Sequence, residues 1–143
     1  MWEIVNQDLG KLERCLEIVK HSAEHYNSWD IEKFRYLINR KNGEFYYYSD
    51  KKAEIVLAFL QNQTYKTWRI KHTAFIGDDP KYAIGVAIKK IKEFLKSKNQ
   101  TAVYGFTAPL NEYKNGNDIY LGELKNISNT KNKMGGLEWQ LNI

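Results

Sequence analysis

Apolar residues recur with two different periods in the middle of the chain, and each change of period marks the start of a new element. From residue 67 to residue 76 the apolar positions alternate, which is typical of a strand. From residue 84 to residue 98 they recur at helical spacing, and residues 101–107 read as a second strand. The order strand, helix, strand predicts a right-handed crossover within one sheet. On the first strand the residues expected to share a face are Trp68, Ile70, His72, Ala74 and Ile76.

The residues before this unit predict a short strand, two helices and two further strands. Asp8 is a suitable N-cap for the first helix and Ser28 for the second, which the pair Asn42-Gly43 would end. The strands that follow are joined by short polar segments, and such connections favour an antiparallel meander. The expected strands of this half are 2–5, 44–49, 54–60 and 65–76.

The last third of the chain is less regular. Pro109 should end the strand that follows the long helix. Residues 111–125 could form a helix, although two glycines in this segment disfavour one. Residues 126–136 are polar and read as a surface loop, and residues 137–143 alternate as a closing strand. We find no linker and no repeat, so we expect one domain that spans residues 1–143.

Composition narrows the range of partners and compartments. The formal net charge of +5 comes mainly from scattered Lys residues, whereas nucleic-acid binders gather Lys and Arg on one face, so the charge argues against a nucleic-acid partner. A single cysteine excludes a disulfide within the chain. No apolar segment approaches the about 20 residues that a membrane span needs, and the first residues do not resemble a signal peptide. We therefore expect a cytoplasmic protein that does not bind membranes.

The turn that opens the long helix reads Tyr82-Ala83-Ile84-Gly85-Val86-Ala87. Together with the order of elements, this turn resembles the GNAT superfamily of N-acetyltransferases. The signature of that family at the start of the long helix is a Gln or Arg, then any two residues, a Gly, any one residue, and a Gly or Ala. The sequence matches at Gly85 and Ala87 and has Tyr82 in the first position. The resemblance implies an α/β fold with a GNAT-like mixed central sheet, an antiparallel meander plus one β-α-β crossover, flanked by helices. It also implies that backbone amides of this turn hold the diphosphate of acetyl-CoA. The cofactor-binding residues expected on this basis are Ile76, Tyr82, Ala83, Ile84, Gly85, Val86, Ala87 and Asn111.

The start of the long helix decides whether those amides are free, and the sequence allows two alternatives. Asp79-Pro80 would make a good N-cap and first helical residue, which would place Gly85 inside the helix and leave Gly85 and Ala87 to bring the helix close to the sheet. If the helix instead starts near Ile84, the amides of residues 82–87 can bind phosphate.

Acetyl transfer needs an acid for the leaving thiolate and a base for the attacking amine. The resemblance implies that a tyrosine late in the chain acts as the acid, and Tyr120 fits this position best. In the family this tyrosine is usually followed by any three residues and then Gly-Phe, and that ending is missing here. His72 and Glu54, both on meander strands, are the candidate bases. His21 and His25 have a spacing that can chelate metal, but no third ligand is evident, so we expect no metal site.

These observations lead to the hypothesis of an acyltransferase that moves an acetyl group from acetyl-CoA, its co-substrate, to an unidentified small-molecule or peptide amine. A non-catalytic GNAT-like interaction or acyl-CoA-binding module is the main alternative, because the first signature position and the tyrosine ending do not match. A nucleic-acid-binding domain that uses the Lys-rich surface is less favoured. An exposed closing strand could pair two copies of the chain into a homodimer.

Overall fold

The computed structural model describes residues 1–5, 9–22, 27–38, 43–106, 130–131 and 137–142. Within these ranges the chain forms three helices and one sheet of seven strands, in the order β1-β2-β3-β4-β5-β7-β6. All neighbouring strands are antiparallel except β4 and β5, which are parallel, so the predicted mixed sheet with one crossover is confirmed. The elements are β1 (Trp2–Ile4), α1 (Leu9–Ser22), α2 (Ile31–Ile38), β2 (Gly43–Ser49), β3 (Ala53–Gln61), β4 (Trp68–Gly77), α3 (Pro80–Ser97), β5 (Ala102–Phe106), β6 (Thr130–Lys131) and β7 (Leu137–Asn142).

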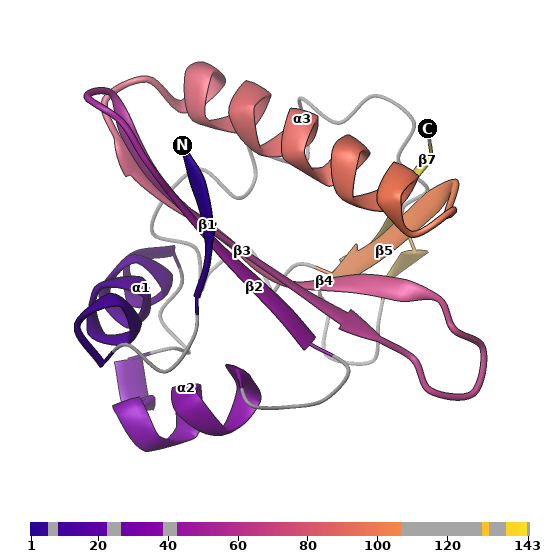
Figure 1. Cartoon of the computed structure of the whole chain (residues 1–143), viewed down its shortest axis with the longest axis horizontal. Helices are drawn as coiled ribbons and strands as arrows, with labels where there is room; N and C mark the ends of the chain where they lie inside the picture. Colours follow the sequence, from indigo (N-terminus) through magenta and orange to yellow (C-terminus); the bar gives the residue numbers. More distant parts are fainter. Residues whose placement is uncertain (6–8, 23–26, 39–42, 107–129, 132–136, 143) are drawn as a thin grey trace.

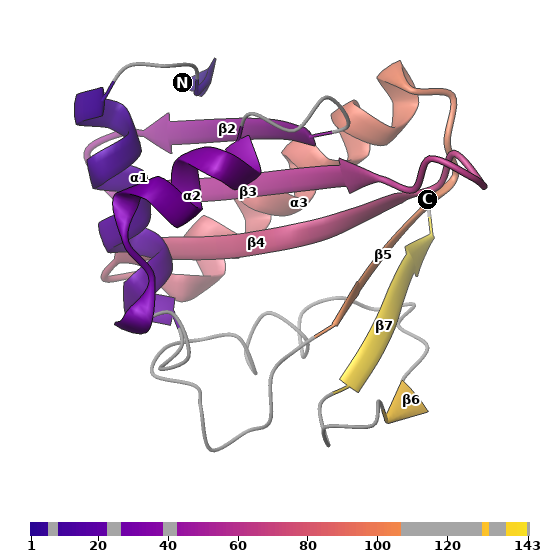
Figure 2. The ribbon, with the colours of Figure 1, turned by 90° about the horizontal axis from the view of Figure 1, so that it is seen from below.

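The helices form two layers, one on each face of the sheet (Figures 1 and 2). α3 covers one face, whereas α1 and α2 cover the other. β3 contributes to both cores, with Ile55, Leu57 and Phe59 on the α3 side and Val56 and Ala58 on the α1 side. Successive residues of a strand point to opposite faces, so a strand covered on both sides needs a continuous apolar run. That requirement explains why β3 lies inside the sheet.

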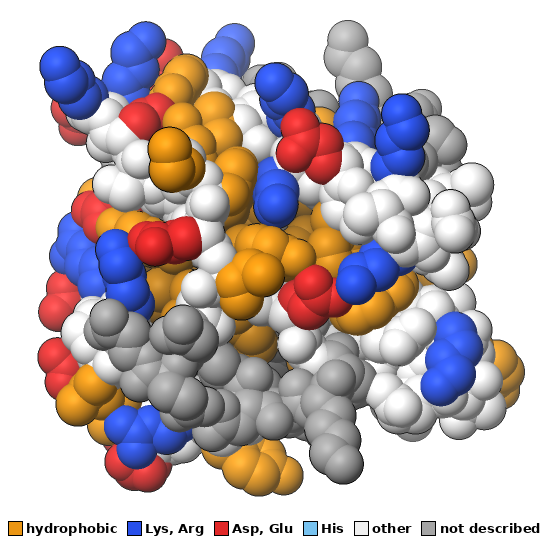
Figure 3. All heavy atoms as spheres, in the orientation of Figure 1, with side chains coloured by type: hydrophobic (Ala, Val, Ile, Leu, Met, Phe, Trp, Pro, Cys, Tyr) orange, Lys and Arg blue, Asp and Glu red, His pale blue; other side chains and the backbone are white. Residues whose placement is uncertain are grey.

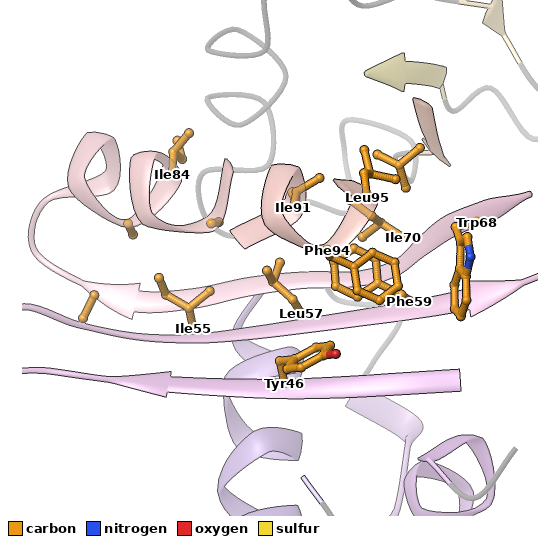
Figure 4. Close-up of a cluster of buried hydrophobic side chains, with 14 residues drawn as sticks. Tyr46, Ile55, Leu57, Phe59, Trp68, Ile70, Ile84, Ile91, Phe94 and Leu95 are labelled. Carbon is orange, nitrogen blue, oxygen red and sulfur yellow. The ribbon is translucent and has the colours of Figure 1, made fainter. Parts of the chain in front are cut away.

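Aromatic rings fill the α3 side of the core near the C-terminal end of α3 (Figure 4). Phe94 of α3 stacks on Phe59 of β3, with ring centroids 3.9 Å apart. The ring of Trp68 meets Phe94 edge-on at 4.9 Å. The edge-on contact is favoured by the ring quadrupoles, and both contacts bury large apolar surfaces between α3 and the sheet.

The two ends of α3 are closed by backbone and side-chain hydrogen bonds. Asp79 is the N-cap and Pro80 the first helical residue, the pairing that the sequence offered as one alternative. At the other end Asn99 adopts a left-handed conformation, with φ of 55°. The N–H of Gln100 donates to the carbonyl of Leu95 at 2.9 Å, which completes a Schellman motif. The interruption seen in the sequence at residues 99–100 is therefore a helix C-cap.

A β-bulge in β4 corrects the prediction that five alternating residues share one face. Ala58 pairs with His72 while its neighbour Phe59 pairs with Ile70, so β4 has one extra residue at this point. The side-chain alternation is inverted beyond the bulge. Trp68 and Ile70 lie in the α3 core, whereas Ala74 lies in the α1 core, together with the partly buried Ile76.

Some predicted boundaries also change. α2 is capped by Asp30 rather than Ser28, because the Asp30 carboxylate accepts a hydrogen bond from Lys33 N at 2.8 Å. Residues 130 and 131, expected in a loop, form β6 instead. β7 pairs with β5 over five residues but with β6 only at Leu137 and Glu138, so no described strand covers residues 139–142 on the β6 side. A homodimer through this strand stays a prediction. The predicted cap Asp8 and the ambiguous segment 111–125 lie outside the described residues.

Candidate active site

The parallel pair β4 and β5 defines the part of the sheet where a ligand could enter. The two strands share one residue pair, Arg69 with Tyr104, and none further along in the described ranges. β5 instead pairs with β7 over five residues and runs obliquely away from β4 (Figure 2). The edge of β4 beyond Arg69 therefore has backbone groups with no strand partner on the β5 side, and such groups need hydrogen bonds from elsewhere.

The N-terminus of α3 lies at the far end of β4 from this pair, and most of its amides are already in use. The N–H of Ala83 donates to the carbonyl of Asp79 at 3.2 Å, the first bond of the helical series. The N–H of Tyr82 donates to the Asp79 carboxylate at 3.1 Å. Since Pro80 has no N–H, Lys81 carries the remaining free amide of the first turn. The alternative in which the helix starts near Ile84, which left the amides of residues 82–87 free for phosphate, is not the observed one.

The side chains of the signature segment are divided between the core and the surface. Ala83, Ile84 and Ala87 are buried in the core beneath α3, and Val86 packs against it. Gly85 is exposed, and a Cβ atom built on it would have no described atom within 4 Å. Gly85 is therefore not required for close contact between helix and sheet, which corrects the packing role considered for it.

Tyr82, the nonmatching position of the signature, connects α3 to the turn between β2 and β3. Its hydroxyl donates to the carboxylate of Asp50, which also accepts from the Tyr48 hydroxyl at 2.6 Å. These hydrogen bonds lower the pKa of Asp50 and raise that of Tyr48. The Lys52 ammonium lies 4.8 Å from the centroid of the Tyr82 ring. The sequence did not reveal this cluster, because its members lie 32 residues apart.

Gly77, at the end of β4, lies against Lys52, which also contacts the Tyr82 ring. A Cβ atom on Gly77 would lie 2.6 Å from the carbonyl oxygen of Lys52. The neighbouring Ile76, a predicted cofactor residue, pairs with Glu54 and packs partly buried on the α1 side. The backbones of β3 and β4 thus meet closely beside the start of α3, and Gly77 is the residue that permits this approach.

Glu54, one of the two predicted bases, is held in an ion pair. Arg14 of α1 binds both of its carboxylate oxygens, with Nε–Oε2 at 2.8 Å, and the Tyr47 hydroxyl donates to it at 2.6 Å. The pKa of Glu54 is lowered to about 2, mainly by the hydrogen bond from Arg14. Such a carboxylate is a weak proton acceptor at neutral pH, so the environment does not suit a general base.

Three other predicted site residues lie wholly or partly outside the described structure. His72 lies in β4 beside the bulge and pairs with Ala58, and its side chain is outside what the structure describes. Tyr120 and Asn111 lie outside the described residues. Cys15 is buried, and burial raises the pKa of its thiol to about 12, so it is not a reactive thiolate at neutral pH. In the described ranges, each helix is too short or too polar to cross a membrane.

Comparison with solved structures assigns this architecture to a known fold. An N-acetyltransferase from Staphylococcus aureus Mu50 superposes with a TM-score of 0.65 and 14% identity, covering 99% of this chain and 97% of the other. The aminoglycoside 6'-N-acetyltransferase from Enterococcus faecium gives 0.68 and 8%, with 99% and 96% covered. The GNAT domain of S. lividans PAT gives 0.66 and 8%, with 99% and 89% covered. No protein-family model and no curated protein matches the sequence. The chain therefore has the GNAT fold, as the order of its elements predicted.

Proposed function

We propose that the protein is an N-acetyltransferase that moves an acetyl group from acetyl-CoA to an amine. The observation that carries the proposal is the single parallel pair between β4 and β5, after which the edge of β4 lacks a partner, in a fold that several acetyltransferases share. The amide groups of an extended pantetheine chain could pair with this edge as an added strand does. The amine would attack the acetyl carbonyl, and the thiolate would leave with a proton supplied by an acid such as Tyr120. His72 remains the candidate base.

The surface charge on α3 supports an anionic co-substrate. Lys81, Lys89, Lys92 and Lys96 are exposed, and none has an ion pair with a described residue. Figure 3 shows several Lys and Arg side chains along the edge that α3 forms. With the amides of residues 84–87 inside the helix, the diphosphate would depend on the Lys81 amide, the helix dipole and these ammonium groups.

A titration of two aspartate variants tests where the diphosphate binds. Asn can replace Asp79 as an N-cap but carries no charge, so Asp79→Asn should strengthen acetyl-CoA binding about fivefold, or about 1 kcal/mol. The matched control is Asp78→Asn, which removes the same charge one residue earlier, outside the cap. Calorimetry should give tighter binding for Asp79→Asn than for Asp78→Asn. Equal affinity in the two variants would contradict a diphosphate at the start of α3.

An assay for released thiol tests catalysis itself. The amine panel should include an aminoglycoside and spermidine, because acetyltransferases of similar fold are named for these acceptors. Free coenzyme A that appears only when an amine is present would support the proposal, and Tyr120→Phe should then slow its release.

A non-catalytic acyl-CoA-binding module is the second candidate. It is favoured by Glu54, whose carboxylate is already engaged by Arg14. Acetyl-CoA binding without thiol release for any amine would support this module. If acetyl-CoA does not bind at all, both functions fail.

A further inference from the structure

A cavity lies at the opposite end of β4 from the start of α3. Its volume is about 430 Å³, and it is lined by the β3–β4 turn (residues 61–63 and 67), by Leu60, and by Trp68, Arg69 and Tyr104. β4 has 10 residues, so at about 3.3 Å per residue the cavity is roughly 30 Å from the N-terminus of α3. The volume falls within the roughly 300–1,000 Å³ range of small-molecule sites.

Arg69 supplies a positive charge to this cavity. It pairs with Leu60 of β3 and with Tyr104 of β5, so the three residues form one row across three strands. The Arg69 side chain is exposed, and no described residue forms an ion pair or hydrogen bond with its guanidinium. A guanidinium has five N–H donors in a planar fork that suits a carboxylate or a phosphate.

Trp68 borders the cavity and is buried. Only 6% of Trp68 is exposed, and none of the described residues accepts a hydrogen bond from its indole N–H. In Figure 4 the ring nitrogen lies on the side turned away from Phe59 and Phe94. Successive residues of a strand point to opposite faces, so the Trp68 ring lies on the α3 face of the sheet and the Arg69 side chain on the other. Trp68 is therefore a reporter at the border of the cavity, and Arg69 is the group that would bind an anion.

Tyr104 contributes an aromatic surface next to the charge. It is 41% exposed, which is high for a ring on an inner strand of the sheet. Because it occupies the position next to Arg69 on the neighbouring strand, its ring can contact the body of a ligand whose anionic group binds the guanidinium.

We propose that this cavity is a second ligand site, which binds a small organic anion roughly 30 Å from the start of α3, where the proposed function places the diphosphate of acetyl-CoA. A carboxylate or phosphate would bind Arg69, and the carbon skeleton of the same ligand would lie against Tyr104.

Nuclear magnetic resonance of the tryptophan side chains tests the site in the intact chain. The four tryptophans give four indole N–H signals, and Trp68→Phe assigns one of them. The wild-type protein is titrated with citrate, with a sugar phosphate and with inorganic phosphate. We expect a saturable shift of the Trp68 signal with citrate, with the sugar phosphate or with both, and the two arms separate carboxylate from phosphate recognition. Arg69→Gln should weaken this binding about tenfold or more.

Lys51→Gln is the matched control, because it removes one exposed charge in the β2–β3 turn, at the opposite end of β4 from the cavity, and should leave the affinity unchanged. Absence of a saturable Trp68 shift at millimolar anion would overturn the proposal. So would equal weakening in Arg69→Gln and Lys51→Gln, which would indicate only general charge attraction. Displacement of the anion by acetyl-CoA would place it in the acyl-transfer cleft and would also overturn the claim of a second site.

Discussion

Replacing Gly85 with alanine tests the observed start of α3 by its effect on stability. Gly85 lies inside α3, is exposed, and has open space where a Cβ would be. Alanine at such a position is favoured over glycine by about 1 kcal/mol, because it loses less backbone entropy on folding. At about 2.1 cal/mol/K per residue, unfolding all 143 residues has an entropy of about 300 cal/mol/K. Gly85→Ala should therefore raise Tm by about 3 °C.

Gly77→Ala makes the same chemical change with the opposite expected sign. The new Cβ would lie 2.6 Å from the Lys52 carbonyl oxygen and 3.3 Å from Cα of Ala53, which pairs with Gly77 in the sheet. Backbone atoms cannot move aside without disturbing that pairing, so we expect a loss of about 1–3 kcal/mol and a Tm lower by roughly 3–9 °C.

Scanning calorimetry of wild type and both variants measures these shifts, and acetyl-CoA titration accompanies it. An unchanged or lower Tm for Gly85→Ala would refute a helix that begins at Pro80. A large loss of acetyl-CoA affinity in this variant would instead favour a phosphate-binding turn at residues 82–87, where a new Cβ would crowd the ligand.

Two further predictions concern the helix end and the ion pair. Asn99→Gly should raise the urea midpoint by an amount equivalent to about 1 kcal/mol, because Asn99 has a φ of 55°, while Asn99→Ala should lower it. The pKa of Glu54 is lowered from 4.5 to about 2, so its stabilising effect is present above pH 4.5 and is lost as the pH falls toward 2. Glu54→Gln should be less stable than wild type at pH 7 and should show a smaller fall in Tm between these pH values; parallel curves would contradict the assignment.

The sequence alone determined the order and type of the elements from β1 to β5 and the closing strand β7, because these depend on local periodicity. The alternating residues of β4 and the helical spacing in α3 predicted a crossover, and Asp79-Pro80 contained the signal for the helix start. From these elements the GNAT fold could be predicted without any matching sequence.

Only the tertiary structure decided which candidate residues are available for chemistry. The β4 bulge depends on pairing with β3, so the change of face between Ile70 and Ala74 has no local signal. Arg14 and Glu54 are 40 residues apart, and only the packing of α1 on the sheet brings them together. A contact of that kind depends on the geometry of the whole fold. A helix or strand depends instead on the conformational preferences and the apolar periodicity of residues that are neighbours in the sequence. That difference is why the fold was predictable and much of the site was not.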